Sequence, residues 1–153
     1  LYHDKLRNEQ AERQLEARQV DLDTLLTQSD FVSVHVNLDE ATLRMFDAPV
    51  FRKMKPSAVF INTARGALHN QSDLYAALSN REIFAAGLDV TDPEPIAQDD
   101  PLLKLPNCLI VPHIASATVS SRNRMSEIAA KNLLAGLKGK PLLCCVNPEV
   151  EDQ

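Results

Sequence analysis

Short apolar runs alternate along the chain with segments in which apolar residues recur at helical spacing. The apolar runs predict strands at residues 31–36, 58–62, 83–90 and 107–112. The helically spaced segments predict helices at residues 22–29, 48–54, 73–80 and 118–137. The continuous apolar character of the third run fits a strand that is covered on both faces. Strands that alternate with helices favour an α/β fold, with a parallel sheet flanked by helices.

Several helix starts are marked by residues whose side chains can accept hydrogen bonds from free backbone N–H groups. Asp21, Asp47 and Ser72 each precede a helical segment, and we expect them to be N-caps. Further upstream, the polar residues 8–19 predict a short surface helix, and residues 1–4 are typical of the end of a strand.

Composition narrows the class of protein. The chain has 153 residues, 44% hydrophobic and 24% charged, which is ordinary for one soluble globular domain. Its net charge of -5 argues against a general surface for nucleic acid or for anionic membranes, and no apolar run has the length of a membrane span. The three cysteines form no CxxC pair, so we expect no metal site and no disulfide framework, and a reducing cytoplasm fits best.

Three polar residues stand just past the ends of predicted strands: Arg65, Glu94 and His113. Because the carboxyl ends of parallel strands converge on one crevice, these side chains are expected to meet there. An Arg, a Glu and a His together would combine an anion clamp with a proton donor. Taken singly, each residue has a plainer interpretation, as a solvated Arg, a loop carboxylate and a turn His.

Longer strings of sequence carry a family resemblance. The strings MKPSAVFINTARG, AAGLDVTDPEP, PLLKLPNCLIVPHIASAT and NLLAGLKGKP resemble the D-2-hydroxyacid dehydrogenases, and among them most closely the glyoxylate/hydroxypyruvate reductases. The resemblance implies a Rossmann-like NAD(P)-binding domain and a hydride transfer between NAD(P)H and a small 2-oxo acid. An alternative on the same scaffold is a dinucleotide-sensing regulatory protein of the corepressor type.

The resemblance also assigns roles. It implies that Arg65 orients the substrate, that His113 donates the proton to the carbonyl oxygen, and that Glu94 holds the imidazole in its protonated form. For the cofactor it points to four residues: Asp4, Thr63, Ala64 and Asp89. Asp4 would bind ribose hydroxyls and so favours NAD slightly over NADP, although Lys5 and Arg7 could attract a 2′-phosphate; a solvated or helix-capping Asp4 is the alternative.

One family motif is missing from these residues. None of the four glycines forms a GxGxxG turn, so we expect the chain to be the C-terminal half of such an enzyme and to be inactive alone. Residues 1–117 would then form a partial NAD(P)-binding domain whose first βαβ unit is missing. Residues 118–153 would be a long helix and tail that return to a substrate domain. Family members are usually dimers, so we expect a homodimer with residues 118–137 at its interface.

Overall fold

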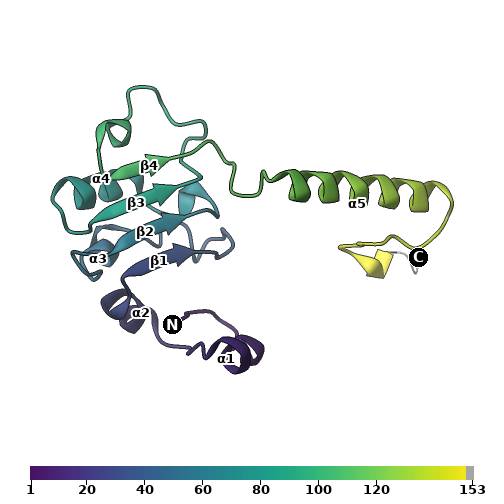
Figure 1. The fold of residues 1–153 in the computed structure, drawn as a ribbon, viewed down its shortest axis with the longest axis horizontal. Helices are drawn as coiled ribbons and strands as arrows, with labels where there is room; N and C mark the ends of the chain where they lie inside the picture. The colour runs from purple at the N-terminus through teal and green to yellow at the C-terminus, as the bar shows by residue number, and fades with distance from the viewer. Residues whose placement is uncertain (151–153) are drawn as a thin grey trace. The chain divides into compact units, whose positions relative to one another are not determined.

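A computed structural model gives the fold, and it describes residues 1–150 (Figure 1). The chain divides into two compact units, with the boundary between His113 and Ile114. The expected division after residue 117 lies close to this boundary and stays a prediction.

The first unit is built on a four-stranded sheet. Its strands are β1 (Phe31–Val34), β2 (Val59–Asn62), β3 (Ala85–Leu88) and β4 (Cys108–Ile110). All of them are parallel, and their order in the sheet is the order in the sequence. The predicted parallel, Rossmann-like α/β sheet is therefore confirmed (Figure 1). Each strand is shorter than its apolar run.

Two helices precede the first strand, and further helices and short 3-10 turns connect the strands. The helices are α1 (Glu9–Leu15), α2 (Leu22–Gln28), α3 (Ala48–Phe51) and α4 (Gln71–Ser79), and the turns are η1 (Gly66–Leu68) and η2 (Pro101–Lys104). Asp21 and Asp47 cap α2 and α3 as predicted. The prediction for α4 was wrong, because Asn70 is its cap and accepts bonds from the backbone N–H groups of Ser72 and Asp73.

The core lies on one face of the sheet. Alternate strand residues, including Val32, Phe60 and Leu88, are buried there against side chains from the helices. On the other face, Phe31 is 70% exposed and Leu109 is 68% exposed. In β3, Ala86 and Leu88 are buried, and Ala85 and Gly87 are partly buried. The expectation that residues 83–90 form a strand covered on both faces stays a prediction.

The N-terminal residues run alongside the start of the second helix. Tyr2 forms a parallel bridge with Gln19, in which its N–H donates to the Arg18 carbonyl at 3.0 Å and its own carbonyl accepts from Val20 at 3.0 Å. Of residues 1–4, which were expected to end a strand, only Tyr2 forms such a bridge, and it lies outside the named strands. In the sequence, α1 lies between the two bridged segments.

The second unit consists of α5 (Val119–Leu137), a tail and the 3-10 turn η3 (Pro148–Val150). The Thr118 side chain accepts a bond from the Ser121 N–H and caps α5. The tail is tied to the helix by Asn132, whose side-chain amide bonds both the N–H and the carbonyl of Cys144. The helix buries no residue, and Leu133 and Leu137 are 65% and 76% exposed. None of the helices in residues 1–150 could cross a membrane.

Candidate active site

The loops that follow β3 and β4 bring Glu94 and His113 into direct contact. The His113 Nδ1 atom lies 2.5 Å from Glu94 Oε1. His113 is placed by its backbone N–H, which donates to the Asp89 carbonyl at 3.0 Å. Asp89 is in turn fixed to β2, since its N–H donates to the Asn62 carbonyl at 2.9 Å. The predicted meeting of Glu94 and His113 is confirmed.

The contact with His113 affects the pKa of Glu94. The hydrogen bond from His113 holds the pKa of Glu94 below its usual value, and the Thr91 backbone N–H acts in the same direction. Partial burial and the charge of Asp89 oppose this effect. Because each side chain of the pair is more than 40% exposed, the contact stays open to solvent and to ligands. An ionised carboxylate on Nδ1 orients the ring so that the Nε2 atom can exchange a proton with a bound molecule.

The pair opens into a cavity of about 500 Å³. Asp89 and Thr91 line it together with apolar residues such as Ile96 and Ile110. Sequence reasoning missed Thr91, whose N–H bonds Glu94 at 3.4 Å and whose hydroxyl donates to the Pro93 carbonyl at 2.8 Å. Its place in the DVTDPEP string, between a strand end and the acid, could have indicated this supporting role.

Arg65 lies at the end of β2, in a separate pocket of about 670 Å³. Thr63 and Ala64 line the same pocket, together with His35 and Asn37 from the loop after β1. The guanidinium is exposed, and its Nη1 atom donates to the Ala64 carbonyl at 2.6 Å. Arg65 has no described contact with either Glu94 or His113, so the expected convergence of all three side chains stays a prediction.

The backbones of these two loops nevertheless touch at Gly66. A Cβ atom added to Gly66 would lie 2.0 Å from the Thr91 carbonyl oxygen. The loop that carries Arg65 is thus packed against the loop that carries Glu94, with no room between them for a side chain.

Asp4 lies in a third region, where a cavity of about 360 Å³ is lined by His3, Lys5, His35 and Asn37. Its carboxylate is exposed and accepts a bond from the Leu6 N–H at 3.1 Å. The alternative of a helix cap is not borne out, because Asn8 caps α1. Asp4 instead stabilises the turn before that helix.

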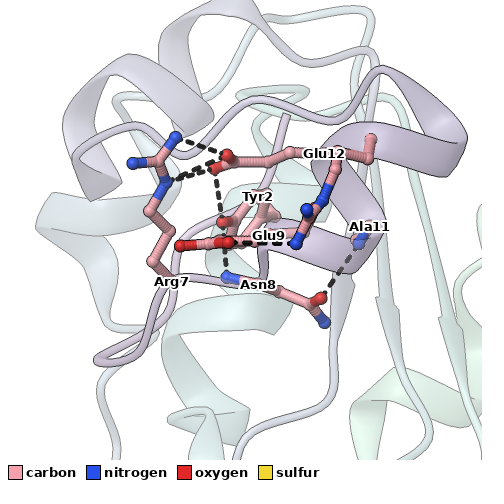
Figure 2. A network of polar contacts seen from close by, with 7 residues as sticks. Tyr2, Arg7, Asn8, Glu9, Ala11 and Glu12 are labelled. Atoms are coloured by element: carbon pink, nitrogen blue, oxygen red, sulfur yellow. Dashed lines mark hydrogen bonds and ion pairs between the residues drawn. The ribbon is translucent and has the colours of Figure 1, made fainter.

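The two cationic residues that follow Asp4, Lys5 and Arg7, each pair with a carboxylate. Arg7 donates to the Glu12 carboxylate through Nε at 2.9 Å and through Nη2 at 2.7 Å. The Tyr2 hydroxyl donates to the same carboxylate (Figure 2). These bonds, from Arg7 first and then Tyr2, hold the pKa of Glu12 below its usual value. Lys5 lies 3.5 Å from Asp39.

The structure shows no candidate metal site within the described residues. Residues 1–150 contain no cluster of three or more His, Cys, Asp or Glu side chains arranged to hold one. The three cysteines are free. Burial raises the pKa of Cys108 to about 11, and Asp100 adds to this effect, so its thiol is a packing group of β4.

Known proteins are similar to this chain in sequence and in fold. The glyoxylate/hydroxypyruvate reductase B of Klebsiella pneumoniae is 48% identical over 151 residues, which are 99% of this chain and 47% of the relative. A crystal structure from Thermus thermophilus matches with a TM-score of 0.88 and 41% identity, over 95% of this chain and 45% of that one. The NAD-complexed D-isomer specific 2-hydroxyacid dehydrogenase of Lactobacillus delbrueckii matches with a TM-score of 0.84 and 32% identity, over 95% and 48%.

The chain thus spans about half the length of the curated relatives that it matches. A family profile, described as D-isomer specific 2-hydroxyacid dehydrogenase, NAD binding domain, matches residues 1–115. These residues contain the whole parallel sheet and both halves of the Glu94–His113 contact. The chain belongs to the D-isomer specific 2-hydroxyacid dehydrogenase family, and its residues 1–115 are NAD-binding domain sequence.

Proposed function

We propose that this protein acts as an NAD(P)-dependent reductase of small 2-oxo acids, of the glyoxylate and hydroxypyruvate class, and produces the D-2-hydroxy acid. The observation that carries the proposal is the 2.5 Å contact between His113 and Glu94 at the mouth of a cavity. It supplies the proton that reduction of a carbonyl group requires. The relative named glyoxylate/hydroxypyruvate reductase B, at 48% identity, supports the substrate class.

The side chains divide the chemistry between them. NAD(P)H, when bound, supplies the hydride. Arg65 is the group that binds the substrate carboxylate, because an exposed guanidinium offers two parallel N–H donors to two oxygens. His113 gives its proton to the oxygen of the reduced carbonyl and takes it back in the reverse direction. Glu94 keeps the ring oriented, with Nδ1 toward the carboxylate and Nε2 left for the substrate.

The residues at the strand ends suit a dinucleotide. The exposed Asp4 carboxylate can accept bonds from ribose hydroxyl groups, and the pocket of Thr63 and Ala64 offers polar groups to a carboxamide. Asp89, which is 5% exposed at the end of β3, lines the cavity of the acid–base pair. We therefore assign cofactor contacts to all four residues.

We further propose that NADH is preferred over NADPH. A 2′-phosphate would need a free cation near Asp4, but Arg7 is held by Glu12 and Lys5 lies against Asp39. The Asp4 carboxylate would itself repel a phosphate. Glu12→Gln would loosen Arg7, so we expect the ratio of kcat/KM for NADPH to that for NADH to rise about three- to tenfold.

Glu16→Gln is the matched control for that change. Glu16 is an exposed carboxylate at the C-cap of α1, and it forms none of the ion pairs described within residues 1–150. A preference for NADPH in the wild-type protein, or equal shifts in the two variants, would contradict the assignment.

The activity is tested by following NAD(P)H oxidation by the full-length protein with glyoxylate and with hydroxypyruvate. We expect His113→Gln to lower kcat/KM by a factor of about 10² to 10⁴, and Arg65→Ala to raise KM strongly. Arg52→Ala removes another exposed arginine, at the end of α3, and should leave both constants unchanged. Tight NADH binding without turnover of any small 2-oxo acid would favour the regulatory alternative, which the names of the relatives do not support.

We propose that residues 118–153 return to a substrate domain, that α5 forms part of a homodimer interface, and that the protein works in the cytoplasm. The apolar side chains of Val119, Leu133 and Leu137 support the interface, since each is more than 60% exposed. Free cysteines are in keeping with a reducing compartment. Leu133→Glu should shift the full-length protein from dimer to monomer in light scattering, whereas Arg124→Glu, an exposed polar site on the same helix, should not.

A further inference from the structure

The loop that carries Arg65 is fastened to the core by a single buried amide. Asn62, the last residue of β2, is fully buried. Its Oδ1 atom accepts from the Ala64 N–H at 3.0 Å, and its Nδ2 atom donates to the Arg65 carbonyl at 2.9 Å. The backbone on either side of the Ala64–Arg65 peptide is therefore held by one side chain.

The orientation of this amide depends on His69. The second donor position of Asn62 Nδ2 faces His69 Nδ1 at 3.0 Å. Burial lowers the pKa of His69 to about 4, so the ring is neutral at pH 7 and Nδ1 carries a lone pair that accepts this bond. If the Asn62 amide turned over, its oxygen would face Nδ1, and the Ala64 and Arg65 backbone groups would both lose their partners.

His69 itself has an unusual environment. The side chain is 1% exposed, packs edge-on against the Phe60 ring at a centroid distance of 5.9 Å, and feels the charge of Asp92. Its Nε2 atom is buried and has no hydrogen-bond partner among the residues that the structure describes. A buried donor that is left unpaired costs free energy, so packing alone would favour an apolar residue at this position.

We infer that His69 is a positioning residue for Arg65, which acts by holding the Asn62 amide in the one orientation that fixes the Arg65 backbone. The inference rests on the proposed role of Arg65 in binding the substrate carboxylate. It explains why a polar ring with an unsatisfied nitrogen lies in this part of the core. It also assigns a function to two residues that have no contact with solvent.

Two substitutions at the same site test the inference in the full-length protein. His69→Leu removes the acceptor but keeps an apolar side chain of similar reach, whereas His69→Asn retains an acceptor atom near the position of Nδ1. We expect His69→Leu to raise KM for the 2-oxo acid about three- to tenfold, the value of one neutral hydrogen bond. Because Ala64 is also assigned to the cofactor, affinity for NADH should fall by less than the KM rises, and His69→Asn should recover most of the wild-type KM.

A double-mutant cycle separates positioning from a merely structural effect. In an Arg65→Ala background, His69→Leu should cause no further increase in KM, because the guanidinium that it positions is absent. Equal increases in both backgrounds would overturn the inference, as would a His69→Asn variant that behaves like His69→Leu.

Hydrogen exchange gives a readout that does not depend on turnover. The Ala64 N–H is bonded to Asn62, so its exchange should be several-fold faster in His69→Leu than in wild-type protein, while the helix α4 stays protected. Unchanged exchange at Ala64 would overturn the inference. If wild-type protein reduced no 2-oxo acid, the proposed function would fail, and exchange at Ala64 would then decide the positioning of the loop separately.

Discussion

The packing of Gly66 against Thr91 can be probed by adding a single methyl group. A Cβ atom at position 66 would lie 2.0 Å from the Thr91 carbonyl oxygen and 2.7 Å from the Asp92 nitrogen. Non-bonded heavy atoms in proteins prefer a separation of about 3.5 Å, so the methyl group needs about 1.5 Å of additional room. Both obstructing groups are main chain, and no change of rotamer can therefore make space for it.

We expect Gly66→Ala to lower the free energy of unfolding by about 3 kcal/mol, at the upper end of the usual cost of overpacking. With a urea m-value of about 1–3 kcal/mol/M, this corresponds to a drop of about 1–3 M in the unfolding midpoint. The assay is urea unfolding followed by circular dichroism. The variant should also lose activity, because moving the Arg65 loop by about 1 Å can cost about 100-fold in rate.

Gly87→Ala is the matched control. Gly87 lies in β3, and a Cβ atom there would have no neighbour within 4 Å among residues 1–150. We expect this variant to be as stable as wild type or up to about 1 kcal/mol more stable, since alanine loses less conformational freedom on folding than glycine. If Gly66→Ala matched Gly87→Ala in its unfolding midpoint, the reasoning about the two loops would be refuted.

Three further predictions follow from single side chains. The pKa of His69 falls from 6.5 to about 4 on folding, so between these pH values the unfolded chain binds a proton that the native chain does not. The free energy of unfolding should therefore fall by about 3 kcal/mol as the pH drops through this range. In urea titrations, His69→Leu should abolish that dependence. The pKa of Glu94 is lowered by His113, so the stabilisation from this pair should be present above pH 4.5 and be lost as the pH falls below it. Glu94→Gln should remove that loss and reduce kcat/KM at least about tenfold, and unchanged kinetics would contradict the role of the carboxylate. Asn70→Ala should cost about 1 kcal/mol in thermal unfolding, because it removes the cap of α4, whereas an equal cost for Ser72→Ala would contradict the assignment of the cap.

The sheet was predictable because its signals are local. Each strand is an apolar run bounded by polar residues. Asp21 and Asp47 each stand directly before the helix that they cap. Local signals also explain the error at α4, where Asn70 and Ser72 are both good caps. Only the fold shows that Asn70 Oδ1 receives the N–H groups of Ser72 and Asp73.

The candidate site was predictable where residues lie within recognisable motifs. Glu94 and His113 could be paired from their places after two neighbouring strands, and the structure joins them. The support of Arg65 could not be found in this way. The space at Gly66 is limited by the Thr91 backbone, which lies 25 positions further along the chain. The role of His69 depends on the buried Asn62 amide, and no local sequence pattern indicates the orientation of that amide.

The order of the strands bears on how this sheet forms. Phe31 pairs with Val59, Val59 with Ala85, and Ala86 with Cys108, so each strand joins the one that precedes it in the sequence. Every step closes a crossover of similar length, roughly 20–30 residues, and therefore costs similar entropy. Among the strands of residues 1–150, none has to wait for a distant partner, which keeps contact order low for a parallel sheet. The sheet can therefore grow by adding one strand at a time, in the order in which a ribosome would deliver them.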